Sequence, residues 1–140
     1  FSPDIFQKLF KPYYEKINNW IHENTKWKTM KHSCGAIQEL IPEFIDCGFD
    51  ILNPIQYSAL KMNPAELKNN FGAQIALWGN CIPTELLISG TTKKIKEHAR
   101  KNCKILSRNS GYIFSLDNLP IKTPFQNILA LLETVSNFKK

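Results

Sequence analysis

The sequence is poor in features that mark several classes of protein. Its four cysteines, Cys34, Cys47, Cys81 and Cys103, are irregularly spaced and include no CxxC pair. Such spacing, without a secretion signal, favours reduced thiols over a disulfide framework. The chain also has no run of about 18 apolar residues, the length that a membrane-spanning helix needs. The sequence therefore predicts neither a disulfide-stapled secreted domain nor a membrane protein.

Glycine-rich phosphate motifs are lacking as well. Neither GxGxxG nor GxxxxGK occurs, which argues against the usual dinucleotide-binding and P-loop proteins. The formal net charge is +6, but the basic residues are scattered, and the densest cluster, residues 91–104, alternates with apolar residues at helical spacing. Since a nucleic-acid surface gathers cations on one face with aromatic rings for stacking, we interpret this cluster as a solvated helix face. We expect no nucleic-acid partner and no membrane partner.

The first residues do not have the basic start, apolar middle and cleavage site of a secretory signal. We therefore expect a cytoplasmic protein. The chain does not begin with methionine, and we expect it to be a piece of a longer polypeptide.

Helical and strand patterns alternate along the chain. A helix is predicted over residues 2–24, with Ser2 as cap and Pro3 at the first helical position. Pro12 is expected to kink it. Apolar residues recur along it at helical spacing, which predicts an amphipathic helix. The other predicted elements are strands at residues 26–33, 49–54, 73–79 and 112–116, and helices at residues 36–48, 63–72, 91–111 and 123–138.

This alternation predicts an α/β fold with parallel strands joined by right-handed crossovers. The strands are short and mostly apolar, as expected when both faces of a sheet are covered. Four such units amount to half of a (β/α)8 TIM barrel, and an open four-stranded parallel sheet is the alternative. A half-barrel has two unpaired strand edges, so we expect it to associate with other chains.

One pair of residues lies at the position where β/α barrels have their active sites. His32 and Cys34 lie two apart at the carboxyl end of the first predicted strand, so their side chains are expected on the same side. Imidazole and thiolate are both good zinc ligands. Cys47 and Cys103 fall within predicted helices and are expected to be core residues. Trp20, Trp27 and Trp78 are expected to pack in the core or at strand ends.

The blocks between these elements resemble the C-terminal half of the uroporphyrinogen decarboxylase superfamily. They are most similar to the branch of methylcobalamin:coenzyme M methyltransferases and related corrinoid methyltransferases. The block that carries most of the resemblance is HSCGAIQELIPEFIDCGFDILNPIQ. Weaker blocks occur before and after it, in the expected order along the chain. SPDIFQKLFKPYYEKI precedes it, and MNPAELKNNFG, LWGN, GTTKKIKEHARK, GYIF and TPFQNILALLET follow it.

The resemblance implies a partial domain over residues 1–140, because members of the family are barrels of more than twice this length. It also implies that His32 and Cys34 bind zinc, with a third ligand on the loop after the last strand. That loop position carries cysteine in the zinc methyltransferases and is Asp117 here. Asn53 and Gln56 resemble pocket-lining positions of the family and are expected to bind substrate.

The implied function is a zinc-dependent transfer of a methyl group from a methylcobalamin protein to a thiol-type acceptor. The expected partners are a corrinoid protein, or the missing N-terminal half-barrel, and a small-molecule acceptor. The chain departs from the family at WGNCIPTE, where Cys81 replaces a glycine and Pro83 an acidic residue. We interpret Cys81 as an incidental thiol, with a substitute metal ligand as the alternative. A uroporphyrinogen decarboxylase-like lyase and a non-catalytic remnant remain alternative functions.

Overall fold

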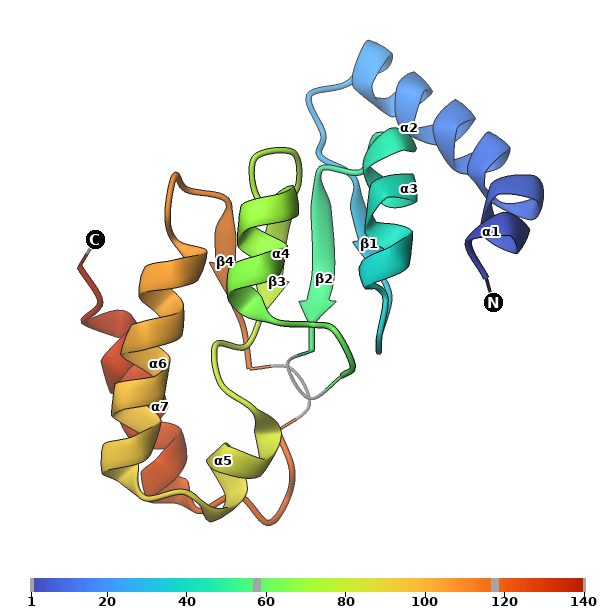
Figure 1. Ribbon diagram of the computed structural model, residues 1–140. Coiled ribbons are helices and arrows are strands. Elements are labelled where there is room, and N and C mark those ends of the chain that lie inside the picture. The colour runs from blue at the N-terminus through green and yellow to red at the C-terminus, as the bar shows by residue number, and fades with distance from the viewer. Residues whose placement is uncertain (1, 57–58, 117–118, 140) are drawn as a thin grey trace.

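A parallel sheet forms the centre of the computed structural model, which describes residues 2–56, 59–116 and 119–139. The described part contains four strands, which lie side by side in chain order (Figure 1). They are β1 (Met30–His32), β2 (Ile51–Ile55), β3 (Ala76–Gly79) and β4 (Tyr112–Phe114). Each crossover moves one strand further in the same direction, which is the winding of a β/α barrel. The prediction of an α/β half-barrel with four parallel strands is confirmed.

Helices connect and flank these strands, and none in the described residues is long and apolar enough to cross a bilayer. In Figure 1, α3 and α4 lie over one face of the sheet, and α6 and α7 run side by side. The helices are α1 (Pro3–Leu9), α2 (Lys11–Asn24), the 3-10 turn η1 (Gln38–Leu40), α3 (Ile41–Asp46), α4 (Pro64–Phe71), α5 (Thr84–Ser89), α6 (Thr92–Leu106) and α7 (Phe125–Ser136).

The helix boundaries follow local chemistry. At α4, Asn63 Oδ1 accepts hydrogen bonds from the amides of Ala65 and Glu66, and Pro64 follows the cap. The predicted first helix is interrupted at Phe10, two residues before Pro12. The predicted helix over 36–48 is shorter and begins as a 3-10 turn. Helix α5 was not predicted, because six residues are too few to show a helical period.

Strand residues that point toward the helices form the core. Leu52 and Leu77 are fully buried and pack with Phe44 of α3 and Leu67 of α4. On the opposite face of the sheet, Met30 and Ile113 remain 44% and 38% exposed. Apolar side chains on an open sheet face, next to two unpaired strand edges, form a surface that a complete barrel would bury.

The apolar residues of α1 and α2 are mostly exposed, and only Phe6 among them is fully buried. The two helices contact the rest of the chain through a different face: the Phe6 and Phe44 rings lie 5.3 Å apart, and those of Tyr14 and Phe49 lie 5.2 Å apart. Four of the exposed apolar residues, Leu9 at the end of α1 and Tyr13, Ile17 and Trp20 on α2, are here called the α2 stripe.

The tryptophan prediction is therefore wrong for two of the three residues. Trp20 is 61% exposed on the α2 stripe, and Trp27 is 72% exposed before β1. Trp78, on β3, is partly buried. Periodicity identified an apolar helix face correctly, but the described residues supply nothing that covers it.

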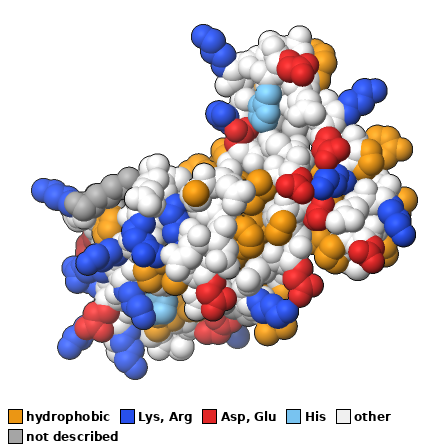
Figure 2. All heavy atoms as spheres, turned by 45° about the horizontal axis from the view of Figure 1, so that its top comes forward, with side chains coloured by type: hydrophobic (Ala, Val, Ile, Leu, Met, Phe, Trp, Pro, Cys, Tyr) orange, Lys and Arg blue, Asp and Glu red, His pale blue; other side chains and the backbone are white. Residues whose placement is uncertain are grey.

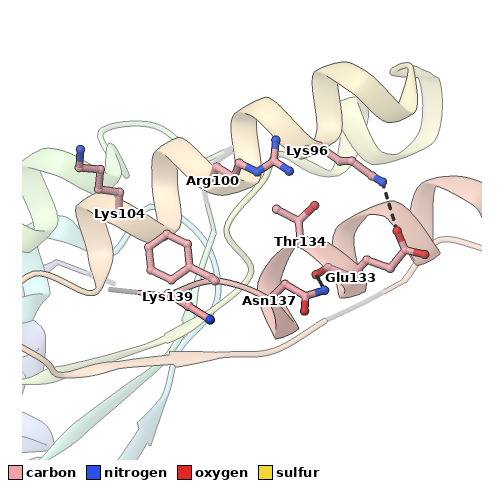
Figure 3. A pocket seen from close by; sticks show the side chains of 8 residues that line it. Lys96, Arg100, Lys104, Glu133, Thr134, Asn137 and Lys139 are labelled. Carbon is pink, nitrogen blue, oxygen red and sulfur yellow. Dashed lines mark hydrogen bonds and ion pairs between the residues drawn. The ribbon is translucent and has the colours of Figure 1, made fainter.

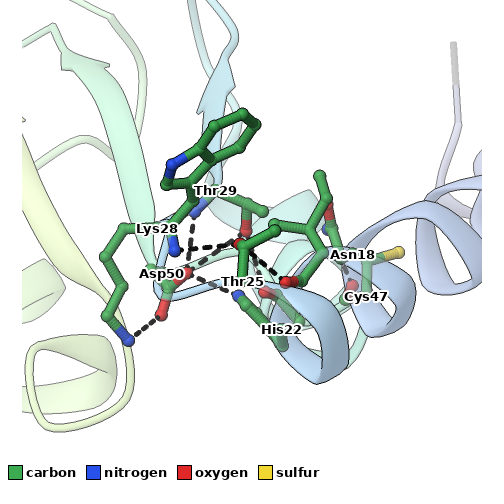
Figure 4. A network of polar contacts seen from close by, with 10 residues as sticks. Asn18, His22, Thr25, Lys28, Thr29, Cys47 and Asp50 are labelled. Atoms are coloured by element: carbon green, nitrogen blue, oxygen red, sulfur yellow. Dashed lines mark hydrogen bonds and ion pairs between the residues drawn. The ribbon is translucent and has the colours of Figure 1, made fainter.

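Asp50 joins α2 to the start of the first two strands (Figure 4). Its carboxylate accepts hydrogen bonds from Lys28 Nζ and from the Thr29 amide, each at 2.8 Å, and lies 2.8 Å from His22 Nε2. Burial acts to raise the pKa of Asp50, but the hydrogen bonds from Lys28, Thr29 and His22 outweigh it and lower the pKa to about 2. The ionised carboxylate is thus a structural group of the native state.

We expect Asp50→Asn to lower the free energy of unfolding at pH 7 by about 1–2 kcal/mol, allowing for partial solvent screening. Because the folded-state pKa is depressed, the contribution of Asp50 is complete above about pH 4 and is lost as the pH falls toward 2. Urea denaturation at pH 7, 4 and 3 tests this. The difference in free energy of unfolding between wild type and Asp50→Asn should become smaller as the pH falls. Glu23→Gln, at an exposed carboxylate of α2, is the control and should change little. A gap that is the same at every pH would contradict the role of Asp50.

Candidate functional site

The candidate site lies at the carboxyl end of the sheet, where β1 leads into a loop. His32 is the last residue of β1, and Cys34 follows in the loop. Cys34 Sγ lies 3.4 Å from His32 Nε2. Cys34 is exposed, so the pair is open to solvent. The structure thus brings together the two side chains that the sequence singled out.

The second strand fixes the orientation of the histidine. His32 pairs with Asn53 in the parallel ladder, and Asn53 Oδ1 lies 2.7 Å from His32 Nδ1. An amide oxygen only accepts hydrogen bonds, so Nδ1 must carry the proton. In the neutral ring this leaves the lone pair of Nε2 directed at the Cys34 sulfur. Asn53 is 7% exposed, so this contact is shielded from water.

Gln56 fixes the loop that carries Cys34. Its Oε1 accepts a hydrogen bond of 2.7 Å from the Gly35 amide. Gly35 has φ = 91°, a left-handed conformation that favours glycine. The loop therefore turns sharply after Cys34, and the hydrogen bond to Gln56, the residue after β2, holds it in place. Asn53 and Gln56 both contact the His32–Gly35 segment; their predicted role in substrate binding stays a prediction.

The pair satisfies simple requirements of a zinc site. Two ligands of a tetrahedral zinc ion, one sulfur and one nitrogen, lie roughly 3.5 Å apart given usual bond lengths. The observed separation of 3.4 Å is close to this value. A metal-binding histidine also normally donates its other ring N–H to an oxygen acceptor, as His32 does to Asn53.

A third ligand is not identified by the described part of the chain. Asp117, the predicted third ligand, lies outside the described residues. Within the described ranges, no group of three or more His, Cys, Asp and Glu side chains is placed to hold a metal ion. His32 and Cys34 therefore fit zinc as two members of a ligand set.

The other cysteines and histidines have structural surroundings. Cys81 is fully buried in the core cluster that also contains Cys103, and a hydrogen bond to the Cys103 thiol, together with burial, raises its pKa. This position supports the interpretation of Cys81 as an incidental thiol. His22 contacts Asp50, and His98 is partly buried, with its pKa lowered by burial and by Lys101.

The geometry defines a class of protein: a β/α-barrel segment with a His-x-Cys pair at the carboxyl end of a strand. The model of the uroporphyrinogen decarboxylase (URO-D) family matches residues 1–138, and the chain belongs to that family. It is 26% identical over 135 residues to Methylcobamide:CoM methyltransferase MtaA of Methanosarcina barkeri, a match covering 94% of this chain and 36% of that protein.

A solved methyltransferase from Methanosarcina mazei has a similar fold, with a TM-score of 0.66 and 21% sequence identity. The match covers 97% of this chain and 37% of that one. The chain thus spans little more than a third of the length of either relative. The predicted family is confirmed, and the likeness lies in its corrinoid methyltransferase branch.

We expect iodoacetamide to modify one of the four thiols rapidly in the folded protein after bound metal is removed with EDTA, and that thiol to be Cys34. Cys34 is exposed, whereas the other three are buried, and burial raises the pKa of Cys47 to about 11. Intact-mass spectrometry of the reduced protein should show a single fast addition. Cys34→Ser should remove it, and Cys103→Ala should leave it unchanged. Two or more fast additions would contradict the described burial.

Proposed function

We propose that this chain forms the C-terminal half of a zinc-dependent, corrinoid-linked methyltransferase. The reaction moves a methyl group from a methylcobalamin protein to a thiol-type acceptor. The acceptor sulfur supplies the electron pair of the new sulfur–carbon bond, and the donor keeps the pair of the bond that breaks. The observation that carries this proposal is the His32 Nε2 to Cys34 Sγ contact at the end of β1, with Nδ1 held by Asn53.

His32 and Cys34 are proposed as two zinc ligands, with Asp117 as the third. Bound zinc lowers the pKa of a coordinated thiol, so that the acceptor is held as the nucleophilic thiolate. Cys34 must lose its proton to bind, whereas His32 would bind through Nε2 in the tautomer whose Nδ1–H donates to Asn53. Asp117 supplies an oxygen donor in place of sulfur, which zinc also accepts.

Asn53 and Gln56 are proposed to act in two ways. Their amide oxygens position the metal-binding segment through His32 and Gly35. Their amide nitrogens, Asn53 Nδ2 and Gln56 Nε2, have no hydrogen-bond acceptor among the described residues and are donors for an oxygen atom of the acceptor substrate. Positioning of the loop and orientation of the substrate thus come from the same two side chains.

We propose that the partner that completes the barrel contributes four strands and three helices. A closed (β/α)8 barrel has eight strands and a helix over each of the eight strand pairs. This chain supplies four strands and five helices in connecting or flanking positions, α2, α3, α4, α6 and α7. Two copies of this chain would provide ten helices, two more than the barrel holds. Where β4 of one copy met β1 of the other, α7 of the first and α2 of the second would compete for the same position. The α2 stripe is then the surface that packs on the partner strands.

The zinc proposal is tested by metal content. We expect about one zinc per chain in freshly purified, reduced protein, and its loss in His32→Ala and Cys34→Ala. Control variants remove the same side-chain types elsewhere: His98→Ala and Cys103→Ala should keep the metal. Inductively coupled plasma mass spectrometry gives the ratio. Wild-type protein without zinc, which also fails to bind added zinc, would refute the proposal and favour the lyase or remnant alternative.

Zinc affinities of Asn53 variants distinguish a role of Asn53 in orienting His32 from a role in the stability of the fold. Asn53→Ala removes the acceptor for His32 Nδ1 and should weaken zinc affinity by about 10- to 100-fold. Asn53→Asp keeps an oxygen acceptor and should retain most of the affinity. Equal losses in both variants, measured by competition with a chelating dye, would show that Asn53 acts through the stability of the fold instead.

The partner proposal predicts the behaviour of the chain in isolation. Exposed apolar surface on the α2 stripe should bind ANS and promote heterogeneous association. The double variant Ile17→Gln/Trp20→Gln should reduce both, while Lys16→Gln/Lys26→Gln should reduce neither. ANS fluorescence and sedimentation velocity give the readouts. A single well-defined dimer that is unchanged in the first variant would favour a second copy of the chain and contradict the helix count.

A further inference from the structure

A groove on the outer helical layer has a charge distribution that the proposed methyltransferase site does not use. It has a volume of about 420 Å³ and lies between α6 and α7 (Figure 3). Basic side chains gather over these helices in the space-filling view (Figure 2). The lining residues are Lys96, Arg100, Lys104, Glu133, Thr134, Asn137, Phe138 and Lys139.

Four cations and one carboxylate line this groove. Lys96 Nζ forms an ion pair with Glu133 Oε2 at 3.1 Å. The other three cations, Arg100, Lys104 and Lys139, have no acidic partner among the described residues. The groove therefore has a local excess of three positive charges.

A bound anion would relieve the repulsion within this excess of positive charge. Lys96, Arg100 and Lys104 are spaced four residues apart on α6, and like charges at this spacing destabilise a helix. The negative end of the helix dipole stabilises a cation in the last turn, which accounts for Lys104. It does not account for Arg100, in the middle of α6, or for Lys139, beyond the end of α7.

The shape of the groove indicates the size of the anion. Its volume is in the range of small-molecule sites, which run from about 300 to 1,000 Å³. Phe138 packs against the buried core and forms a fixed apolar wall. The Arg100 guanidinium offers paired donors that match phosphate oxygens, and Lys96, Lys104 and Lys139 are further positive charges on the lining. We propose that this groove binds a small molecule with two or three adjacent phosphate groups.

The proposal does not depend on zinc or methyl transfer, because none of its residues belongs to the candidate site. It also differs from nucleic-acid binding, which needs a longer basic track and several stacking surfaces. An acidic protein segment is the competing occupant, and the experiment includes it.

Isothermal titration of the full chain with pyrophosphate, at constant ionic strength adjusted with sodium chloride, tests the proposal. We expect saturable binding with one site per chain. Arg100→Gln/Lys104→Gln should weaken it by at least roughly tenfold, as expected for the loss of charge-assisted hydrogen bonds. Lys93→Gln/Lys94→Gln removes the same charge from the same helix outside the groove and should change the affinity by less than about threefold. Glu133→Gln removes the only carboxylate among the described residues that line the groove and should tighten binding.

Three results would overturn the proposal: no saturable binding by the wild type, equal weakening in the two double variants, or weaker binding in Glu133→Gln. Poly-glutamate provides the comparison with a protein partner. Its binding with the same variant dependence, together with no binding of pyrophosphate, would assign the groove to an acidic polypeptide and refute the small-ligand proposal. Circular dichroism melting confirms that each variant is folded. If the groove double variant unfolds, the affinity of Glu133→Gln decides the question.

Discussion

The parallel register between β1 and β2 is the constraint on which the candidate site depends. Only three residue pairs form this ladder, from Met30 opposite Ile51 to His32 opposite Asn53. Side-chain hydrogen bonds hold it at both ends: Thr29 contacts Asp50 before the ladder, and His32 contacts Asn53 where it finishes. A shift of one residue would break both contacts and turn His32 to the other face. The register thus determines both the stability of this corner and the orientation of the imidazole.

The exposed surfaces share one explanation. The open sheet face and the α2 stripe have exposed apolar side chains, and each lies where a complete barrel would cover it. The relatives are almost three times as long as this chain, which is consistent with such a continuation. The basic groove differs from these surfaces, because it is charged and lies between two helices that already pack on each other. The two proposals thus concern different surfaces: barrel closure would use the apolar ones, and a separate ligand would use the groove.

Much of the fold could be predicted from the sequence, because caps and periodicity are local signals. Asn63 with Pro64 marked the start of α4, and the alternation of elements identified the parallel topology. The exposure of the apolar face of α1 and α2 could not be predicted. Periodicity shows that a helix has an apolar face, but it does not show which neighbour covers that face. Helix α5 was missed, since its sequence is too short for a periodic signal and follows Pro83 directly.

The site was predicted in part. The His32 and Cys34 pair was visible from its spacing at the end of a strand. The contact of Asn53 with His32 could not be derived from sequence spacing, because it depends on the register between two strands. It could have been anticipated from a polar residue at the end of an otherwise apolar second strand. Asp117 remains a prediction that rests on the family resemblance.

The loop glycine at the site has a consequence for protein chemistry. A Cβ atom built on Gly35 meets no atom within 4 Å, so the backbone conformation, and not lack of space, restricts this position. The restriction is one of chirality, since positive φ is unfavourable for L-residues and natural for their mirror images. A chain made by chemical ligation with D-alanine at this position would keep the turn after Cys34.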